Sequence, residues 1–361
     1  MKKITLFINS LSSGGAEHQI SILANQLVEK GYEVTLTTLS TGQDHYCLDA
    51  RVARKKIGGS RSFAKIARLW YYMITVDTDC FISFCQRNSF FSLPPLFLRR
   101  RIRVICGERN LTVGNSDVYE KNLIKYLYRR ADAIVSNNHS QEEYLNIVAP
   151  HLSSKLSTII NYTNLDEYLV SPLPNNDILR IGVFARFDTQ KNCSRFCDAI
   201  SMLKRNCTTP FEIHWYGNKI SGGKVTATYN EVVEKIKTHN LQDTFFIHEP
   251  VKKTAPVISE MDAICLPSLF EGFSNSVAEA ICCGRPMLVS NISDNGLMVH
   301  DKDNGFLFAP EDVESICDAF NSYFNCTTSQ REQMAKRSRE IATDLFAGDN
   351  FINSYIKIIE L

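Results

Sequence analysis

The stretch Pro267–Pro286 most constrains the fold of this chain, because an apolar run suited to a buried β-strand lies on each side of it. Asp262–Leu266 leads into the stretch and Met287–Ser290 follows it. Between the two runs lie a polar turn and a short helix, which Gly284-Arg-Pro286 ends. This order of strand, turn, helix and strand predicts an α/β fold with a parallel sheet.

The turn and the start of this helix carry the candidate chemistry. Gly272–Asn275 is small and polar, and either Ser274 or Asn275 is suited to cap the helix. A helix N-terminus after a parallel strand presents free backbone N–H groups and a positive dipole end, which suit a phosphate. Glu271 precedes that terminus, and Glu279 lies one to two turns inside the helix. Because carboxylates repel phosphate, we expect both to accept hydrogen bonds from sugar or ribose hydroxyls.

Taken together, the Pro-Ser, Glu-Gly-Phe, Glu-Ala and Gly-x-Pro strings of this stretch resemble the donor-site signature of retaining glycosyltransferases of family four, which have the GT-B fold. The resemblance implies that Glu279 holds the ribose hydroxyls and that Glu271 contacts the sugar and takes part in catalysis. It also implies that donor-binding backbone groups come from the turn, namely Gly272, Phe273, Ser274 and Asn275. The alternative is an ordinary strand-loop-helix with two surface glutamates.

Two basic residues follow another expected strand, Leu179–Ala185. Arg186 and Lys191 are close enough in one loop for both to reach one diphosphate, Arg as a planar fork and Lys as a point charge. The Arg…Gln-Lys-Asn string resembles the diphosphate-binding pair of the same family, and this implies a donor-binding and catalytic role for both residues. The alternative is two solvated charges. Further along, Asn218–Lys224 is polar and contains glycine, so we expect a mobile loop.

The N-terminal part begins with a second βαβ unit. Its expected elements are a strand at Lys3–Asn9, a helix at Ala16–Lys30 and a strand at Glu33–Leu39. The Gly-Gly-Ala-Glu string at the first crossing resembles the first loop of the family, and its paired glycines allow a close backbone approach, so Gly15 is a candidate donor-binding residue. A tight turn without a ligand is the alternative.

Glu108 is the candidate catalytic residue of this N-terminal part. The string Gly107-Glu108-Arg109-Asn110 follows the expected strand Arg103–Cys106, at the strand end where open α/β sheets bind ligands. Many members of the family carry a histidine there, and a Glu-Arg-Asn version resembles a subset that builds bacterial surface polysaccharides on lipid carriers. Glu108 is suited to accept hydrogen bonds from substrate hydroxyls or to serve as a base. The alternative is a salt bridge between Glu108 and Arg109.

A chain of 361 residues suggests two domains. We expect domains at 1–170 and 178–345 and a last helix at 346–361. The resemblance implies that the first domain binds the acceptor, that the second binds the donor, and that the last helix crosses back to the first domain. The resemblance implies that both are Rossmann-like domains with parallel sheets that face each other across a cleft. No apolar run is long enough to span a bilayer, and the twelve scattered cysteines suggest reduced thiols, so we expect a cytoplasmic protein.

The distribution of charge suggests an anionic partner. Residues 1–175 contain 21 Lys and Arg against 15 Asp and Glu, whereas residues 176–361 contain 19 against 24. Residues 51–76 hold seven basic residues and no acidic one, and four arginines lie between Arg99 and Arg103 beside Phe97 and Leu98. A basic helix with aromatic residues at its end suggests peripheral binding at the inner face of an anionic membrane, with a solvated helix face as the alternative. We expect no nucleic-acid partner, because no nucleic-acid motif accompanies the charge.

The resemblance to this family implies a retaining, metal-independent glycosyltransferase that uses no cofactor. We expect a nucleotide-sugar donor, a UDP-sugar, and a glycan acceptor linked to a polyprenyl diphosphate in capsule, O-antigen or exopolysaccharide synthesis. Asp77-Thr-Asp79 resembles the metal motif of another glycosyltransferase class, but it precedes a strand, so we expect a turn. Two other functions stay open, a nucleotide-sugar epimerase of the same architecture and a non-catalytic nucleotide-sugar binder.

Overall fold

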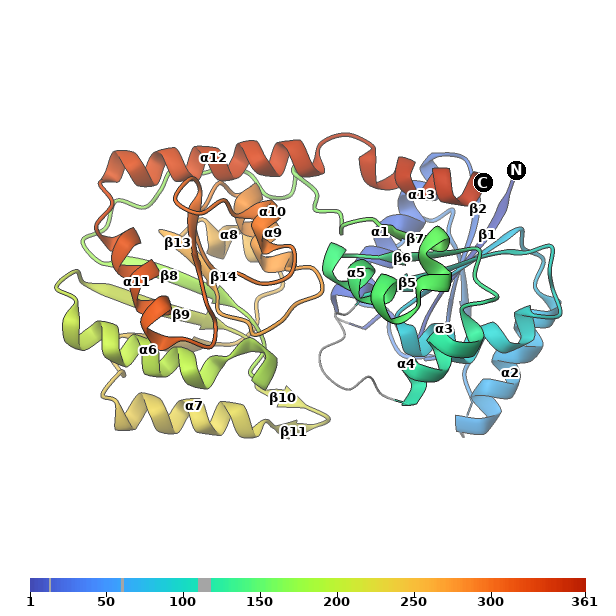
Figure 1. Ribbon diagram of the computed structural model, residues 1–361, viewed down its shortest axis with the longest axis horizontal. Coiled ribbons are helices and arrows are strands. Elements are labelled where there is room, and N and C mark those ends of the chain that lie inside the picture. Colours follow the sequence, from blue (N-terminus) through green and yellow to red (C-terminus); the bar gives the residue numbers. More distant parts are fainter. Residues whose placement is uncertain (13, 60–61, 110–117) are drawn as a thin grey trace. The chain divides into compact units, whose positions relative to one another are not determined.

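The protein divides into two compact units, each with its own parallel sheet (Figure 1). The computed structural model describes residues 1–12, 14–59, 62–109 and 118–361. The first unit comprises Met1–Tyr162 with Asp349–Leu361, and the second comprises Thr163–Gly348. The prediction that the two face each other across a cleft stays a prediction.

The first unit is built on a seven-stranded sheet in the order β3-β2-β1-β4-β5-β6-β7, and every neighbouring pair is parallel. Alternation of apolar residues along β1 sends Leu6 to one face of the sheet and Phe7 to the other. The strands are β1 (Lys3–Ile8), β2 (Glu33–Thr38), β3 (Ala53–Lys56), β4 (Cys80–Phe84), β5 (Arg103–Glu108), β6 (Ala133–Ser136) and β7 (Leu156–Thr158).

Helices cover both faces of this sheet. Leu6 packs against α1 (Gly15–Glu29) and α13 (Asn350–Glu360), so the last helix of the chain completes the core of the first unit. Phe7 packs in the other core. The helices that contribute to it are α2 (Ser62–Thr75), α3 (Gln86–Leu96), the π-helical turn η1 (Leu123–Leu127), α5 (His139–Val148) and the 3₁₀ turn η2 (Pro150–Lys155), and the short α4 (Val118–Asn122) leads into η1.

The second unit repeats the design with six parallel strands in the order β12-β9-β8-β13-β14-β15. This order reverses direction next to β8, which is where open α/β sheets bind ligands. The strands are β8 (Leu179–Phe184), β9 (Phe211–Tyr216), β12 (Phe245–His248), β13 (Ala263–Leu266), β14 (Met287–Ser290) and β15 (Gly305–Phe308), with a short hairpin of β10 (Ile220–Ser221) and β11 (Lys224–Val225).

The helices of the second unit also lie on both sides of its sheet (Figure 1). Phe196 of α6 packs on Trp215 of β9 and on Phe320 of α11, which assigns these two helices to one face. The helices are η3 (Thr189–Lys191), α6 (Cys193–Asn206), α7 (Ala227–Thr238), α8 (Thr254–Ile258), α9 (Asn275–Cys282), α10 (Asn295–Met298), α11 (Val313–Phe324) and α12 (Thr328–Phe346).

The predicted α/β class with parallel sheets is confirmed, and two local predictions need correction. The predicted loop at Asn218–Lys224 forms the β10–β11 hairpin. The basic segment 51–76 is not one helix, because β3 precedes α2. Further along, α4 runs directly into the π-helical turn η1. Within the described parts of the chain, no helix combines the length and the apolarity that crossing a bilayer requires.

Candidate active site

The candidate donor site lies where two strands of the second unit end, β8 and its neighbour β13. The loop after β8 carries Arg186 and leads into η3, which carries Lys191. Asp188 caps η3, and its carboxylate accepts a hydrogen bond from the Lys191 backbone N–H at 3.1 Å. The loop after β13 carries Glu271 and leads into α9. Because the two strands are parallel neighbours, both loops leave the same edge of the sheet.

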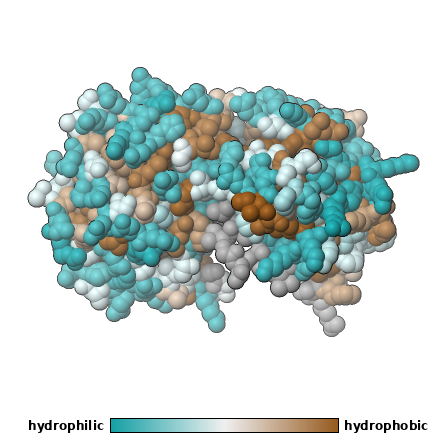
Figure 2. Space-filling model, in the orientation of Figure 1, coloured by the Kyte–Doolittle hydropathy of each residue, from teal (hydrophilic) through white to brown (hydrophobic). Residues whose placement is uncertain are grey.

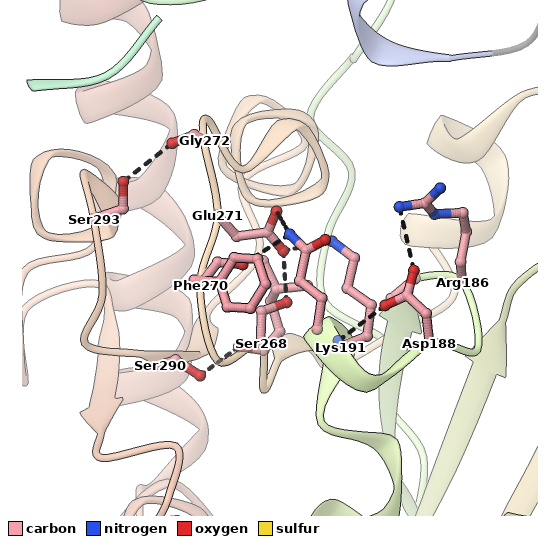
Figure 3. A network of polar contacts seen from close by, with 12 residues as sticks. Arg186, Asp188, Lys191, Ser268, Phe270, Glu271, Gly272, Ser290 and Ser293 are labelled. Atoms are coloured by element: carbon pink, nitrogen blue, oxygen red, sulfur yellow. Dashed lines mark hydrogen bonds and ion pairs between the residues drawn. The ribbon is translucent and has the colours of Figure 1, made fainter. Parts of the chain in front are cut away.

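Lys191 and Glu271 form a largely buried ion pair, with 14% and 8% of their side chains exposed (Figure 3). Glu271 Oε1 also accepts a hydrogen bond from Ser268 Oγ at 2.6 Å. Gln190 Nε2 donates to Glu271 Oε2 at 3.3 Å and to the Phe270 carbonyl at 2.8 Å. Glu271 is therefore held by three side chains, so its carboxylate has a fixed direction beside the Lys191 ammonium.

Arg186 contrasts with Lys191, because 68% of its side chain is exposed. Its Nη2 atom lies 3.2 Å from Asp188 Oδ2, the same carboxyl group that caps η3 (Figure 3). A pair this exposed contributes little to stability. The guanidinium can therefore leave Asp188 for a stronger anion at small cost, whereas Lys191 is fixed.

Helix α9 begins at the predicted place, with Ser274 as its N-cap residue. The Ser274 side chain makes no capping hydrogen bond, and its buried hydroxyl has no partner among the described residues. The Phe273 ring is buried and packs edge-on to Phe346, so only the backbone of Phe273 is available to a ligand. The Gly272 carbonyl accepts a hydrogen bond from Ser293 Oγ at 3.1 Å. A buried hydroxyl without a partner beside a helix N-terminus suits a polar ligand.

Glu279 lies inside α9 and has partners that differ from those of Glu271. Its Oε2 accepts a hydrogen bond from Thr254 Oγ1 of α8 at 2.8 Å, and Tyr168 supplies a second hydroxyl. Burial raises the pKa of the Glu279 carboxyl, and the two hydroxyl donors partly offset that rise. Glu279 is thus placed by side chains from outside its own helix. The predicted roles of Glu271 and Glu279 toward sugar and ribose stay predictions.

The first unit holds the other two candidates, Gly15 and Glu108. Gly15 is the first residue of α1 and follows Gly14, whose N–H donates to the Tyr46 hydroxyl at 3.1 Å. A Cβ atom on Gly14 would lie 2.3 Å from the Glu17 carboxylate, a contact that rotation of the flexible Glu17 side chain would relieve. The turn is closed by these local contacts, and the binding role of Gly15 stays a prediction.

Glu108 ends β5 and is only 1% exposed. Gln141 Nε2 lies 3.4 Å from its Oε2 atom, whereas Oε1 has no hydrogen-bond partner in the described part of the chain. Burial raises the pKa of Glu108 to about 8, and the charge of Glu120 adds to the rise. A carboxyl group with a pKa of about 8 is mostly protonated at neutral pH and is then able to donate a hydrogen bond to a ligand. Its predicted role as a base stays a prediction.

Arg109 does not form the salt bridge with Glu108 that was the alternative reading of this string. Its guanidinium donates to the Tyr355 hydroxyl of α13 and lies 3.4 Å from Asn161 Oδ1. It also lies over the Phe84 ring, 3.9 Å from the centroid. Arg109 therefore connects β5 to the last helix and leaves Glu108 unneutralised. Asn110, the end of the Glu-Arg-Asn string, lies outside the described residues.

The sequence did not identify four side chains that position the candidates. Ser268 and Gln190 hold Glu271, and Thr254 and Tyr168 hold Glu279. Ser268 and Gln190 stand within the strings quoted above, so their positions were available as a signal. No local signal identified Thr254 or Tyr168, because the fold brings them to Glu279 from distant segments.

Comparison with known proteins agrees with the class that the two sheets and the donor-side residues define, a GT-B glycosyltransferase. Residues 13–166 match the model for "Glycosyltransferase Family 4", and residues 177–325 match the model for "Glycosyl transferases group 1". The two matches together cover most of both units. The chain belongs to this family of glycosyltransferases.

Relatives and solved structures agree with this assignment. The chain is 24% identical to an amylovoran biosynthesis glycosyltransferase, AmsD, of Erwinia amylovora, across 84% of this chain and 87% of that protein. It is also 24% identical, across 87% and 88%, to an N-acetylgalactosamine-N,N'-diacetylbacillosaminyl-diphospho-undecaprenol 4-alpha-N-acetylgalactosaminyltransferase of Campylobacter jejuni. Anabaena HepE, crystallised with UDP and glucose, matches the fold with a TM-score of 0.86 at 16% identity over the full length of both chains.

Proposed function

We propose that this protein is a retaining glycosyltransferase that transfers a sugar from a UDP-sugar to a glycan acceptor on a polyprenyl-diphosphate carrier. The reaction would serve the assembly of a surface polysaccharide at the cytoplasmic face of the membrane. Arg186, Lys191, Glu271 and Glu279 form the donor side of the proposed site, together with the turn that begins α9. Gly15 and Glu108 are the candidates in the first unit.

The fixed Lys191–Glu271 pair beside the start of α9 is the observation that carries this proposal. A diphosphate that approaches the helix N-terminus offers Lys191 a stronger anion than one carboxylate, and the exposed Arg186 is free to turn toward the same group. Glu271 would then be released from its ion pair, and its oxygens would accept hydrogen bonds from sugar hydroxyls. Donor binding and the freeing of Glu271 are thus one event in this proposal.

The chemical step follows from these positions. The bond between the anomeric carbon and the diphosphate oxygen breaks while the acceptor hydroxyl attacks the same face of the sugar, so the anomeric configuration is retained. The acceptor proton passes to the departing phosphate oxygen, and UDP leaves. Lys191 and Arg186 stabilise the negative charge that grows on the diphosphate, the role that a metal ion has in other classes. We therefore propose that the reaction needs no metal.

Two of the similar proteins support the choice of substrates. HepE was crystallised with UDP and glucose, which favours a UDP-sugar donor. The Campylobacter jejuni relative is named for a diphospho-undecaprenol substrate, which favours a lipid-linked acceptor. The name of the Erwinia amylovora relative refers to the biosynthesis of amylovoran and favours a role in polysaccharide assembly.

A comparison of two lysine variants tests the donor site. Lys191→Met keeps the length of the side chain but removes its charge, so we expect UDP affinity and turnover of the cognate UDP-sugar to fall roughly 100-fold or more. Lys204→Met is the matched control, because Lys204 also pairs with a carboxylate, that of Asp243, on another part of the same unit. Equal activity of the two variants would contradict the proposal.

The products distinguish the three functions that the sequence left open. A glycosyltransferase releases UDP and forms a glycoside, whose anomeric proton in NMR reports retention or inversion. An epimerase returns an isomerised UDP-sugar, and a non-catalytic binder returns the donor unchanged with every acceptor. Activity that survives EDTA is expected, and a loss that only added metal restores would contradict metal independence.

A further inference from the structure

Helix α2 of the first unit has a second apolar face, which is largely exposed in the part of the chain that the structure describes. Leu69 and Met73 are fully buried in the core. On another side of the helix, four large apolar residues are 84%, 42%, 72% and 47% exposed, namely Phe63, Trp70, Tyr71 and Ile74. At about 100° per residue these four share a stripe roughly 100° wide. An ordinary surface helix has only the inward stripe, so the outward one needs an explanation.

Neighbouring residues enlarge this stripe. Helix α3 packs beside α2, and Trp70 Nε1 donates to the Phe91 carbonyl of α3 at 2.8 Å (Figure 1). Phe97 and Leu98, directly after α3, are 41% and 79% exposed. They precede Arg99, whose guanidinium donates to the carbonyls of Met73, in the last turn of α2, and of Val76, just after α2, at 3.3 Å and 2.5 Å. We define the α2–α3 patch as Phe63, Trp70, Tyr71, Ile74, Phe97 and Leu98.

Hydrogen bonds divide the basic residues of this region into two groups. One group is used inside the fold, since Arg54 pairs with Asp44, Arg99 binds carbonyls at the end of α2 and Arg103 binds the Ile358 carbonyl. A second group has no hydrogen bond or ion pair to any residue that the structure describes, namely Lys65, Arg68, Arg100 and Arg101. Arg61 lies outside the described residues.

Two members of the second group lie beside the patch. Arg68 lies on α2 itself, and Arg100 follows Leu98 closely in the chain, whereas Arg101 lines a pocket with Asp79 and Glu360. Nearby acids are few, because the sequence has none between Cys80 and Gly107 and Asp77 is paired with Lys3. The patch is therefore apolar at its centre, with unneutralised basic residues at its border. The space-filling view shows hydrophobic side chains at several places on the hydrophilic surface, so exposed apolar residues alone do not define a docking site and the bordering charge is needed (Figure 2).

The size and composition of the patch favour a lipid surface over a protein partner. A stripe of about 16 Å by 10 Å on one helix is far below the roughly 800 Å² that each partner buries in a stable dimer. Trp and Tyr suit the boundary between lipid and water, and unpaired Arg and Lys suit anionic headgroups. We propose that the α2–α3 patch docks the protein on an anionic membrane, with Phe63, Tyr71, Ile74 and Leu98 entering the headgroup region.

The tryptophans provide a direct test, because the protein has only two. Trp70 belongs to the patch, whereas Trp215 is fully buried in the second unit. Vesicles of phosphatidylethanolamine with phosphatidylglycerol should therefore shift the fluorescence of the full chain to the blue. The shift should be absent in Trp70→Phe and smaller with phosphatidylethanolamine alone. No shift with anionic vesicles would overturn the proposal.

Co-sedimentation with the same vesicles gives a second test. We expect Phe63→Ser/Tyr71→Ser/Ile74→Ser to lower the partition coefficient at least about tenfold. Arg68→Gln and Arg100→Gln should each lower it about fivefold at low salt and less at high salt. Ile147→Ser is the matched control, because Ile147 is 78% exposed on α5 of the same unit. It should bind like the wild type.

Three results would overturn the proposal. They are a triple serine variant that binds vesicles like the wild type, an Ile147→Ser variant that loses binding equally, and a dimer in light scattering that the triple variant abolishes. The last result would assign the patch to contact between two copies. None of these measurements needs turnover, so failure here would leave the proposed transfer reaction standing, and an inactive enzyme would leave this proposal standing.

Discussion

Lys191 and Glu271 neutralise each other in a buried pair. Removing both charges should therefore restore stability that removing one charge loses, but it should not restore UDP binding. Lys191→Met leaves a buried carboxylate without its partner, and we expect a loss of about 3 kcal/mol in the free energy of unfolding. Lys191→Met/Glu271→Gln removes both charges and should recover most of that stability in urea unfolding. UDP affinity in titration calorimetry should remain low in the double variant. A double variant as unstable as the single one would show that the pair is not what stabilises this region.

Glu108 gives a prediction with a definite dependence on pH. Its pKa of about 8 in the fold lies above the ordinary 4.5, so the folded state holds a proton that the unfolded state releases. The stability due to this proton is complete below pH 4.5 and is lost as the pH rises through 8. Glu108→Gln cannot ionise, so we expect it to match the wild type near pH 4 and to be more stable at pH 9, by on the order of 3 kcal/mol.

Thermal unfolding of Glu108→Gln and of the wild type across this pH range measures the difference. Asp132→Asn is a suitable control, because Asp132 lies on the same unit but its side chain is 41% exposed. A difference between Glu108→Gln and the wild type that does not change with pH would contradict the buried, protonated state of Glu108.

At the scale of elements, α13 is the segment whose role is easiest to test. Ile359 is 1% exposed in the core that α13 shares with β1 and α1. Ile359→Ala should lower the free energy of unfolding of the first unit by about 2–4 kcal/mol, because it leaves a cavity that the core cannot fully close. Lys357→Ala, on the same helix but outside that core, should change it by less than about 0.5 kcal/mol. Chemical denaturation of both variants would decide this, and equal effects would contradict the packing of α13.

The strands show how far local pattern determines this fold. The expected strands at Glu33–Leu39, Arg103–Cys106 and Met287–Ser290 agree with β2, β5 and β14 to within two residues, because buried parallel strands are short apolar runs. The strand β3 was missed because its residues, Ala53–Lys56, are mostly basic. It joins the sheet by pairing with β2, where its arginine binds the β2 carbonyl of Leu36. That contact joins two separate segments of the chain, so the hydrophobicity pattern of residues 53–56 alone does not predict it.

The candidate site shows the same division between local and tertiary information. Glu271, Lys191 and Arg186 were identified because the family strings and the strand-turn-helix order mark them. Their pairing was not, because Lys191 and Glu271 are 80 residues apart and only the neighbouring positions of β8 and β13 bring them together. The prediction that Arg186 and Lys191 reach one diphosphate therefore did not include the Glu271 carboxylate that pairs with Lys191. For α2, the sequence indicated a basic helix with aromatic residues at its end. It did not show which apolar residues of α2 are exposed, because that depends on how the rest of the fold packs against the helix.

At the scale of the whole molecule, the chain forms two compact units, each with its own sheet. This division suggests that heating unfolds the protein in more than one step. A destabilising substitution in the core of one unit shows which unfolding transition belongs to that unit. Ile359→Ala should lower the transition of the first unit. For the second unit we choose Arg285→Met, because Arg285 is fully buried and donates to the carbonyls of Ser171, Ile258 and Ser259. Loss of these bonds should cost about 3 kcal/mol.

The assigned transitions then test where the nucleotide binds. Arg186, Lys191 and Glu279 all lie in the second unit, so UDP should raise the transition that Arg285→Met lowers. At 100 times its dissociation constant UDP should stabilise that unit by about 2.7 kcal/mol. Differential scanning calorimetry with and without UDP measures both transitions in one experiment, and Lys191→Met should remove most of the shift. A UDP-dependent shift of the transition that Ile359→Ala lowers would instead place the principal nucleotide contacts in the first unit, and the donor role of Arg186 and Lys191 would then be wrong.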